Sequence, residues 1–152
     1  MKLRIAAAFV LIAATSLHAQ TAMPDLSTAT PIAGNWTYSS TLDGSEAVFV
    51  NAAAQPQLTI RCTRAPRRVT ISKPASGAAP FLAVWTSAQA RNLPASFNPA
   101  TARISADLSA YDPLLDAIAF SRGRFGVSVS GGPPLVLPAW AEPARVVEDC
   151  RA

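Results

Sequence analysis

The chain has 152 residues, half of them hydrophobic, with 13 basic and 9 acidic side chains. This length suits one domain with its own core and is short for two ordinary domains. Two of the basic residues, Lys2 and Arg4, belong to an N-terminal targeting segment, and without them the net charge falls from +4 to +2. So small an excess does not indicate nucleic acid binding, and we expect no nucleic acid partner.

Residues 1–19 have the organisation of a secretory signal peptide. Lys2 and Arg4 form its basic part, residues 5–15 are almost entirely apolar, and small residues precede a cleavage site before Gln20. The apolar stretch is shorter than the roughly 20 residues of a membrane-spanning helix. The sequence therefore predicts a secreted, periplasmic protein with no membrane span after cleavage.

Cleavage removes His18, the only histidine in the chain. Ser-His-Asp catalysis, Cys-His catalysis and histidine-bearing zinc sites all use an imidazole, so they are excluded from the mature protein. No glycine-rich phosphate loop or dinucleotide fingerprint is present. A calcium site built from Asp107, Asp112 and Asp116 is conceivable, but a helix cap and solvated acids explain these residues better. We expect neither a metal nor a cofactor.

The two cysteines of a secreted chain predict one disulfide, Cys62–Cys150. This bond would hold the C-terminal segment, which ends two residues after Cys150. In the chain-entropy model a loop of this length gives roughly 4–5 kcal/mol of stabilisation, as an upper estimate.

The segment 20–33 is polar, contains two prolines and predicts a flexible lead to a single β-rich domain at 34–152. Within the domain, Asp43-Gly44 separates two alternating segments and predicts a tight hairpin turn. A loop is expected at 74–80 and a turn at 97–100. Strands are predicted at 35–39, 46–50, 57–62, 68–72, 81–86, 90–95, 102–108, 124–130 and 135–137.

Helix signals occur at two places. Asp112 suits an N-cap, Pro113 the first helical position and Gly123 the end, so a helix is predicted at 112–121. A second helix at 142–149 would turn Val146, Val147 and Cys150 inward. Many short strands between Gly and Pro turns predict a mainly β fold, an antiparallel β-sandwich or partly closed barrel with one or two short helices.

Arginines form the most distinctive charged groups. Four lie within eight residues around a strand–turn–strand unit, and two more lie at a helix-to-strand junction. If they converged, their guanidinium groups would form an anion-binding face for an acidic envelope component or another protein. The favoured alternative is that they pair with Asp112, Asp116, Glu148 and Asp149 or stay solvated. The six candidates are Arg61, Arg64, Arg67, Arg68, Arg122 and Arg124.

The aromatic residues Trp36, Tyr38, Trp85 and Trp140 could line a sugar-binding surface. Tryptophans on strands more often pack in the core or on a sheet, and that interpretation is favoured here. Trp140, between two prolines, is the best candidate for an exposed aromatic surface.

Carboxylates are the remaining catalytic groups of the mature chain. A glycoside-cleaving site needs two of them across a cleft, roughly 5–10 Å apart. Most of the nine acids have a structural explanation as turn, cap or surface residues. We therefore expect no enzyme activity and favour a secreted binding or envelope-accessory module. A small carboxylate-dependent hydrolase of cell-envelope glycan is the alternative, and a purely structural envelope protein is a third possibility.

The order of features from Leu58 onward resembles small secreted bacterial proteins of the invasion-associated locus B type and β-rich accessory proteins of type VI secretion. The similarity consists of Leu58-Thr59-Ile60-Arg61-Cys62, an apolar strand reaching Trp85-Thr86, Asp112-Pro113-Leu114-Leu115-Asp116, strands at 124–129 and 135–137, and a closing segment ending in Cys150. This resemblance implies a periplasmic β-sandwich that binds a partner, and it supplies no catalytic residues.

Overall fold

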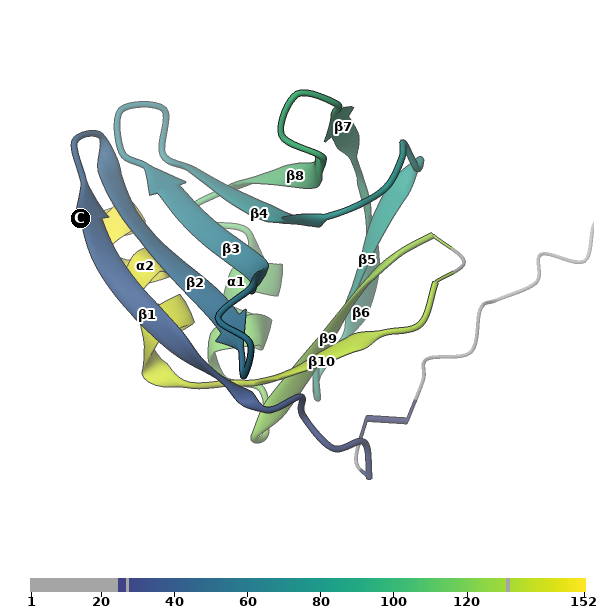
Figure 1. Cartoon of the computed structure of the whole chain (residues 1–152). Helices are drawn as coiled ribbons and strands as arrows, with labels where there is room; N and C mark the ends of the chain where they lie inside the picture. Colours follow the sequence, from purple (N-terminus) through teal and green to yellow (C-terminus); the bar gives the residue numbers. More distant parts are fainter. Residues whose placement is uncertain (1–24, 27, 131) are drawn as a thin grey trace, which may run out of the picture.

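The computed structural model describes residues 25–26, 28–130 and 132–152. The predicted signal peptide at 1–19 and the first residues of the predicted lead, 20–24, lie outside the described residues. The described chain forms two antiparallel sheets and two helices, so the prediction of a mainly β fold is confirmed (Figure 1). The sheets do not close into a barrel, and the arrangement is sandwich-like.

The larger sheet has six strands in the order β1-β2-β3-β4-β8-β7. They are β1 (Gly34–Thr41), β2 (Gly44–Asn51), β3 (Pro56–Thr63), β4 (Arg68–Pro74), β8 (Arg103–Ser109) and β7 (Ser96–Asn98). The smaller sheet has the order β10-β9-β5-β6. Its strands are β10 (Leu135–Pro138), β9 (Arg124–Val129), β5 (Phe81–Trp85) and β6 (Ala90–Pro94). Every strand predicted from the sequence is present.

The predicted turn at Asp43-Gly44 joins β1 to β2. The Thr41 hydroxyl donates a hydrogen bond to Asp43 at 2.9 Å, and Thr41 pairs with Gly44 across the hairpin. A Cβ atom on Gly44 would come within 2.2 Å of the Cys62 carbonyl oxygen on β3. Only glycine therefore fits here, because β3 approaches the hairpin so closely.

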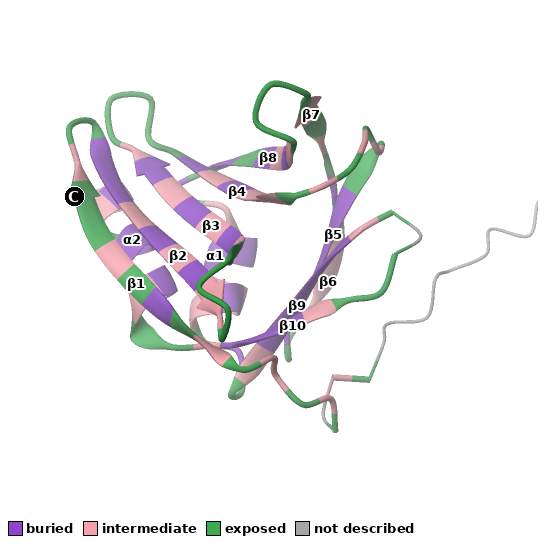
Figure 2. Ribbon diagram, viewed as in Figure 1, coloured by how far each residue is buried: buried purple, intermediate pink, exposed green. Residues whose placement is uncertain are grey.

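The core lies between the inner faces of the two sheets and the helices. Buried and more exposed residues alternate along β3 and β4, with Leu58, Ile60 and Cys62 buried, as the sequence predicts (Figure 2). Trp36 joins the two sheets, because its indole N–H donates to the Pro138 carbonyl at 2.9 Å and its ring stacks on Phe125. The favoured interpretation of Trp36 as a core residue is confirmed.

Two helices complete the core, α1 (Pro113–Ala119) and α2 (Ala141–Arg151). Asp112 caps α1 as predicted, by accepting from the Leu114 N–H at 2.9 Å. The predicted end of α1 was wrong, because the helix stops at Ala119 and not at Ser121. Ser121 is buried, and its hydroxyl accepts a tertiary hydrogen bond from the Ser87 N–H and donates a local one to the Arg124 carbonyl, so it is held outside the helix.

One smaller correction concerns the segment 97–100, predicted as a turn. Phe97 and Asn98 belong to the short strand β7, which pairs with Ile104 and Arg103 of β8 before the chain turns. Pro99 has no N–H to donate to the neighbouring strand, and this limits β7 to three residues.

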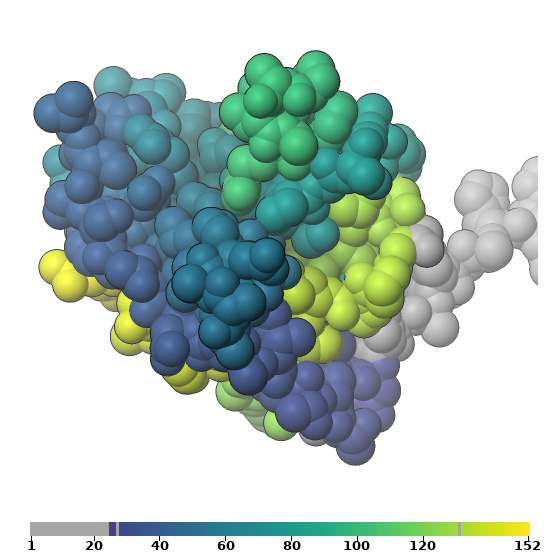
Figure 3. Space-filling view, in the orientation of Figure 1, coloured from purple at the N-terminus to yellow at the C-terminus, as the bar shows by residue number. Residues whose placement is uncertain are grey.

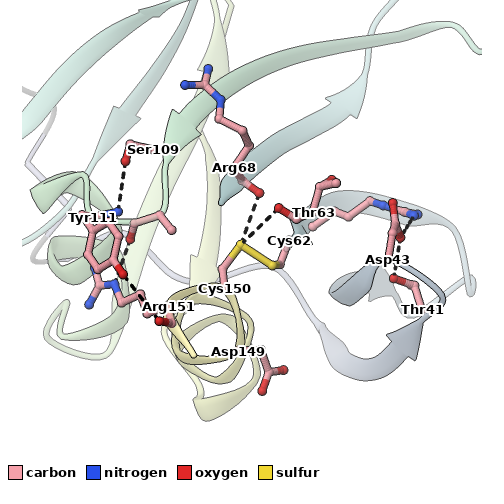
Figure 4. Close-up of a disulfide and its surroundings, with 12 residues drawn as sticks. Thr41, Asp43, Cys62, Thr63, Arg68, Ser109, Tyr111, Asp149, Cys150 and Arg151 are labelled. Atoms are coloured by element: carbon pink, nitrogen blue, oxygen red, sulfur yellow. Dashed lines mark hydrogen bonds and ion pairs between the residues drawn. A yellow bond between two sulfur atoms is a disulfide. The ribbon is translucent and has the colours of Figure 1, made fainter. Parts of the chain in front are cut away.

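The predicted disulfide Cys62–Cys150 is present and links β3 to α2, with both cysteines buried and their Cα atoms 5.4 Å apart. Figure 4 shows the Thr63 and Arg68 carbonyl oxygens directed at Cys150 Sγ, at 3.9 and 3.3 Å. These are close contacts and not hydrogen bonds, because a disulfide sulfur carries no proton. Val146, Val147 and Cys150 of α2 are buried, as predicted. The described residues include no helix long and apolar enough to cross a membrane.

Candidate ligand-binding site

A candidate site lies on the outer face of the smaller sheet. Leu82 and Val84 of β5 point into the core, so Phe81, Ala83 and Trp85 lie on the opposite face. Ala83 pairs with Asn92 of β6 on one side and with Ser128 of β9 on the other. Trp85 pairs in the same way with Ala90 and Gly126. Both neighbours of the indole are therefore among the smallest residues.

These small side chains leave a hollow of about 480 Å³ beside Trp85, which we call the Trp85 groove. Its volume is within the range of roughly 300–1,000 Å³ that is usual for small-molecule sites. The described residues that line it are Ala83, Trp85, Ala90, Arg91, Asn92, Ser128, Ser130 and Gly132.

Two aromatic side chains flank the floor of this surface. Trp85 is half-buried and lies outside the core, and Phe81 is 42% exposed. They are four residues apart on one strand, so their Cα atoms are separated by about 13 Å at a rise of about 3.3 Å per residue. Ala83 and Ser128, both buried, form the floor between them. Phe81 is not part of the groove lining and continues the aromatic face beyond it, so an extended ligand could contact both rings.

One side of Trp85 is closed by the segment that precedes β1. A Cβ atom on Gly126 would lie 3.4 Å from Cε3 of Trp85 and 3.3 Å from Cδ1 of Leu26, so both side chains lie over this glycine. The segment is held by a bond from the Ile32 N–H to the Val136 carbonyl at 3.0 Å. The Arg124 guanidinium also donates to the Ala29 carbonyl. Figure 3 shows this segment, in purple, lying against the yellow-green strands at 124–138.

Arg91, the charged residue in the lining, is the cross-strand partner of the core residue Val84, so its side chain starts on the inner face and is directed to α1. Arg91 forms an ion pair with Asp112 at 2.7 Å, at the cap of α1. Burial alone would raise the pKa of Asp112, but hydrogen bonds from Arg91 and the Leu114 N–H outweigh it and lower the pKa. Among the described residues the groove lining has no carboxylate. Its remaining polar side chains are the Asn92 amide and the Ser128 and Ser130 hydroxyls.

Five of the six arginine candidates form two separate groups in the structure. Arg64, Arg67 and Arg68 are exposed near the β3–β4 turn, where the Arg67 carbonyl accepts from Ala110 just before α1. Arg122 and Arg124 follow the other end of α1, and the Arg122 N–H bonds the Ser87 hydroxyl. The two groups therefore lie near opposite ends of α1.

The surroundings of these arginines agree in part with the favoured expectation of pairing or solvation, because Arg64, Arg67, Arg68 and Arg122 are exposed. Arg61 pairs with Asp43 at 2.7 Å and with Glu46 at 3.6 Å. Arg67 bonds the Tyr111 hydroxyl, and Arg64 lies close enough to Asp149 to help lower its pKa. Two of the four acids expected as partners pair with other arginines: Asp112 with Arg91, and Asp116 with Arg151.

The other aromatic candidates have different surroundings. Trp140 is 45% exposed at the N-cap of α2. Tyr38 donates to Asp149 at 2.5 Å, and the Arg145 guanidinium lies 3.9 Å from the centre of its ring. Sequence reasoning named Trp85 among four aromatic candidates but preferred Trp140 as the exposed one. Phe81 and Trp85, at alternate positions of one strand, are the signal for an aromatic outer face.

A second groove lies along α2 and is lined by Tyr38, Glu142, Arg145 and Glu148, among others. The two glutamates are six residues apart on one helix, about 9 Å along its axis, with Arg145 between them. They do not face one another from opposite walls. The Glu142 Oε2 atom is buried and makes no hydrogen bond within the part of the chain that the structure describes.

The conceivable calcium ligands Asp107, Asp112 and Asp116 are not gathered. Asp107 accepts a hydrogen bond from Thr70 at 2.5 Å, while the other two are in the ion pairs given above. The described residues contain no group of three or more His, Cys, Asp or Glu side chains that could hold a metal ion.

Comparisons of this chain with protein-family models, with curated proteins and with solved structures find no match. The candidate site is therefore interpreted from its own geometry.

Proposed function

We propose that this protein is a secreted, non-enzymatic binding module of the bacterial envelope, and that it binds its ligand in the Trp85 groove. The observation that carries the proposal is the pair of aromatic side chains, Phe81 and Trp85, on either side of a floor of small residues. A half-buried tryptophan and an exposed phenylalanine on one strand face offer a large rigid contact area at a low cost in side-chain entropy.

The Cys62–Cys150 bond supports an extracytoplasmic location, because structural disulfides persist in oxidising compartments. The sequence of the first 19 residues supports the same location. N-terminal sequencing of the protein recovered from the periplasm should begin at Gln20. Retention of the intact chain in the cytoplasm would contradict this part of the proposal.

The chemistry of the groove supports binding over catalysis. Its described lining offers one amide, two hydroxyls and a guanidinium that is paired with Asp112. These groups hydrogen-bond a ligand well, but none is a carboxylate or an imidazole, the side chains that most often perform general acid–base catalysis. The alternative of a carboxylate-dependent hydrolase would have to use Glu142 and Glu148 in the second groove. Those two acids lie on one helix, which does not suit attack from two sides of a bond.

Affinity capture from envelope extract, under non-reducing conditions, tests the binding function. The wild-type protein should retain a saturable component that the double variant Phe81→Ala/Trp85→Ala fails to retain. Trp140→Ala is the matched control, because it removes an exposed tryptophan far from the groove in the sequence and should leave capture unchanged. Equal capture by wild-type protein and the double variant would contradict the assignment of the groove.

A further inference from the structure

We propose that the ligand of the Trp85 groove is a neutral oligosaccharide whose rings stack on Trp85 and Phe81. This inference rests on the proposed function and specifies the chemistry of its ligand. The first argument is shape. The two aromatic side chains are about 13 Å apart along β5, a span longer than one sugar ring, and the floor between them carries only Ala83 and Ser128.

The second argument is the match of polar groups. The Asn92 side chain is on an exposed strand position and can both donate and accept. The Ser130 hydroxyl donates to the Phe81 carbonyl at 3.2 Å, so its oxygen lone pairs face a ligand as acceptors. Sugar hydroxyls also donate and accept, and their C–H faces are apolar. A groove with aromatic ends and amide and hydroxyl sides fits both properties.

The third argument is charge. The Arg91 guanidinium is held by Asp112 at 2.7 Å, and the described lining has no carboxylate. A charged ligand would gain little from a cation that is already neutralised, while a cationic ligand would meet no anion. The net neutrality of the lining therefore favours an uncharged glycan over a phosphorylated or carboxylated one.

A peptide strand is the competing occupant, since β6 pairs only with β5 and forms an edge of the sheet. A peptide strand added there would form hydrogen bonds with the free backbone edge of β6. Pro94 at the end of β6 has no N–H to donate to such a strand. Such a peptide would extend the sheet sideways and leave Trp85 and the floor uncovered. The aromatic face is thus better explained by a sugar.

The test uses the three tryptophan indole N–H signals in a nuclear magnetic resonance spectrum of the mature protein. Each signal is assigned from a Trp→Phe variant. The probes are the tetramers of β-1,4-linked N-acetylglucosamine, β-1,4-linked glucose and α-1,4-linked glucose. At least one tetramer should shift the Trp85 signal saturably, while the Trp36 signal, whose indole bonds Pro138 in the core, stays unchanged.

Two variants make the result specific. Trp85→Ala should weaken binding of that tetramer at least tenfold, as expected when an anchoring aromatic is removed. Ala83→Leu keeps Trp85 but fills the floor, and it should weaken binding to a similar extent. Trp140→Ala should bind as the wild type does. Because Trp85 lies outside the core, its replacement should leave the Trp36 signal in place, which verifies folding.

The inference is overturned if no neutral tetramer shifts the Trp85 signal at millimolar concentration. It is also overturned if the Trp85→Ala and Ala83→Leu variants bind the tetramer as the wild type does. Tighter binding of polygalacturonate or of a synthetic extended peptide than of any neutral tetramer would overturn it as well. If envelope capture still depends on Phe81 and Trp85 while all neutral tetramers fail, the binding function stands and the ligand class is wrong. If capture is also independent of these residues, both proposals fail.

Discussion

The Trp85 indole lies over Gly126, its cross-strand neighbour on β9, with a distance of 3.4 Å between Cε3 and the position that a Cβ atom on Gly126 would take. The same position lies 3.3 Å from Leu26 of the segment before β1. The absence of a side chain at residue 126 therefore sets the position of the aromatic wall of the groove and gives the N-terminal segment a place to pack.

Replacing Gly126 by valine tests this relationship. The added Cγ atoms would meet Trp85 and Leu26 directly, so we expect a loss of about 1–3 kcal/mol in the free energy of unfolding and weaker ligand binding. Urea denaturation measures the first and titration of the ligand the second. Gly77→Val is the control, because a Cβ atom at Gly77 meets nothing within 4 Å. Equal effects of the two substitutions would show that Gly126 has no special role.

The sequence predicted the strands of this region but not the groove. The segment Phe81-Leu82-Ala83-Val84-Trp85 is apolar throughout, so it predicts a central strand, which β5 is, without showing that its two faces differ. The groove depends on the register that sets Ala90 and Gly126 beside Trp85. Pairing between strands distant in the chain is not contained in the local pattern, and neither is the contact of Leu26 with this face.

The disulfide gives a second prediction. The variant Cys62→Ala/Cys150→Ala should lose about 2–5 kcal/mol of stability in urea denaturation. Hydrogen exchange should show the loss of protection first in α2, because the bond ties this helix to β3. Reduction of the wild-type protein is the control and should reproduce the effect. Alkylation that detects two free thiols in the secreted wild-type protein would contradict the assignment.

Local signals predicted the rest of the fold well wherever short-range chemistry decides it. Asp43-Gly44 fixed the first hairpin, and Asp112-Pro113 fixed the start of α1. The end of α1 was mispredicted because Ser121 leaves the helix to accept a hydrogen bond from the Ser87 N–H, which is a tertiary contact. The sequence predicted pairing or solvation for the arginines but not the pair of Arg61 with Asp43, because the pairing of β2 with β3 brings these two residues together.

A third prediction concerns acid. Asp112 has a lowered pKa in the folded protein, so at low pH the unfolded chain takes up the proton first and unfolding is favoured. The contribution of Asp112 to stability is complete above its ordinary pKa of 3.8 and is lost as the pH falls through the lower folded value. We expect Asp112→Asn to flatten this part of the pH profile while keeping an acceptor for the Leu114 N–H.

The pH profile of the unfolding free energy, measured by urea denaturation from neutral pH to about pH 2, checks this prediction. Because Arg91 is the charged partner, Arg91→Gln should flatten the same part of the profile, and the double variant should add little more. Additive effects of the two substitutions would show that Arg91 is not what lowers the pKa of Asp112.

The last prediction concerns the arginines, which would bind an acidic partner as two independent patches. The seven residues of α1 separate the groups by about 10 Å or more along the helix axis, and effects at such distances usually add. Two variants test this, one with glutamine at Arg64, Arg67 and Arg68 and one with glutamine at Arg122 and Arg124. Each should lower the salt concentration that elutes the protein from a phosphate-bearing resin. In the combined variant the two decreases should add. A combined loss much larger than the sum would show that one anion site uses both groups. Arg61→Gln is the matched control: its guanidinium already pairs with Asp43 and Glu46, so its removal should change elution least.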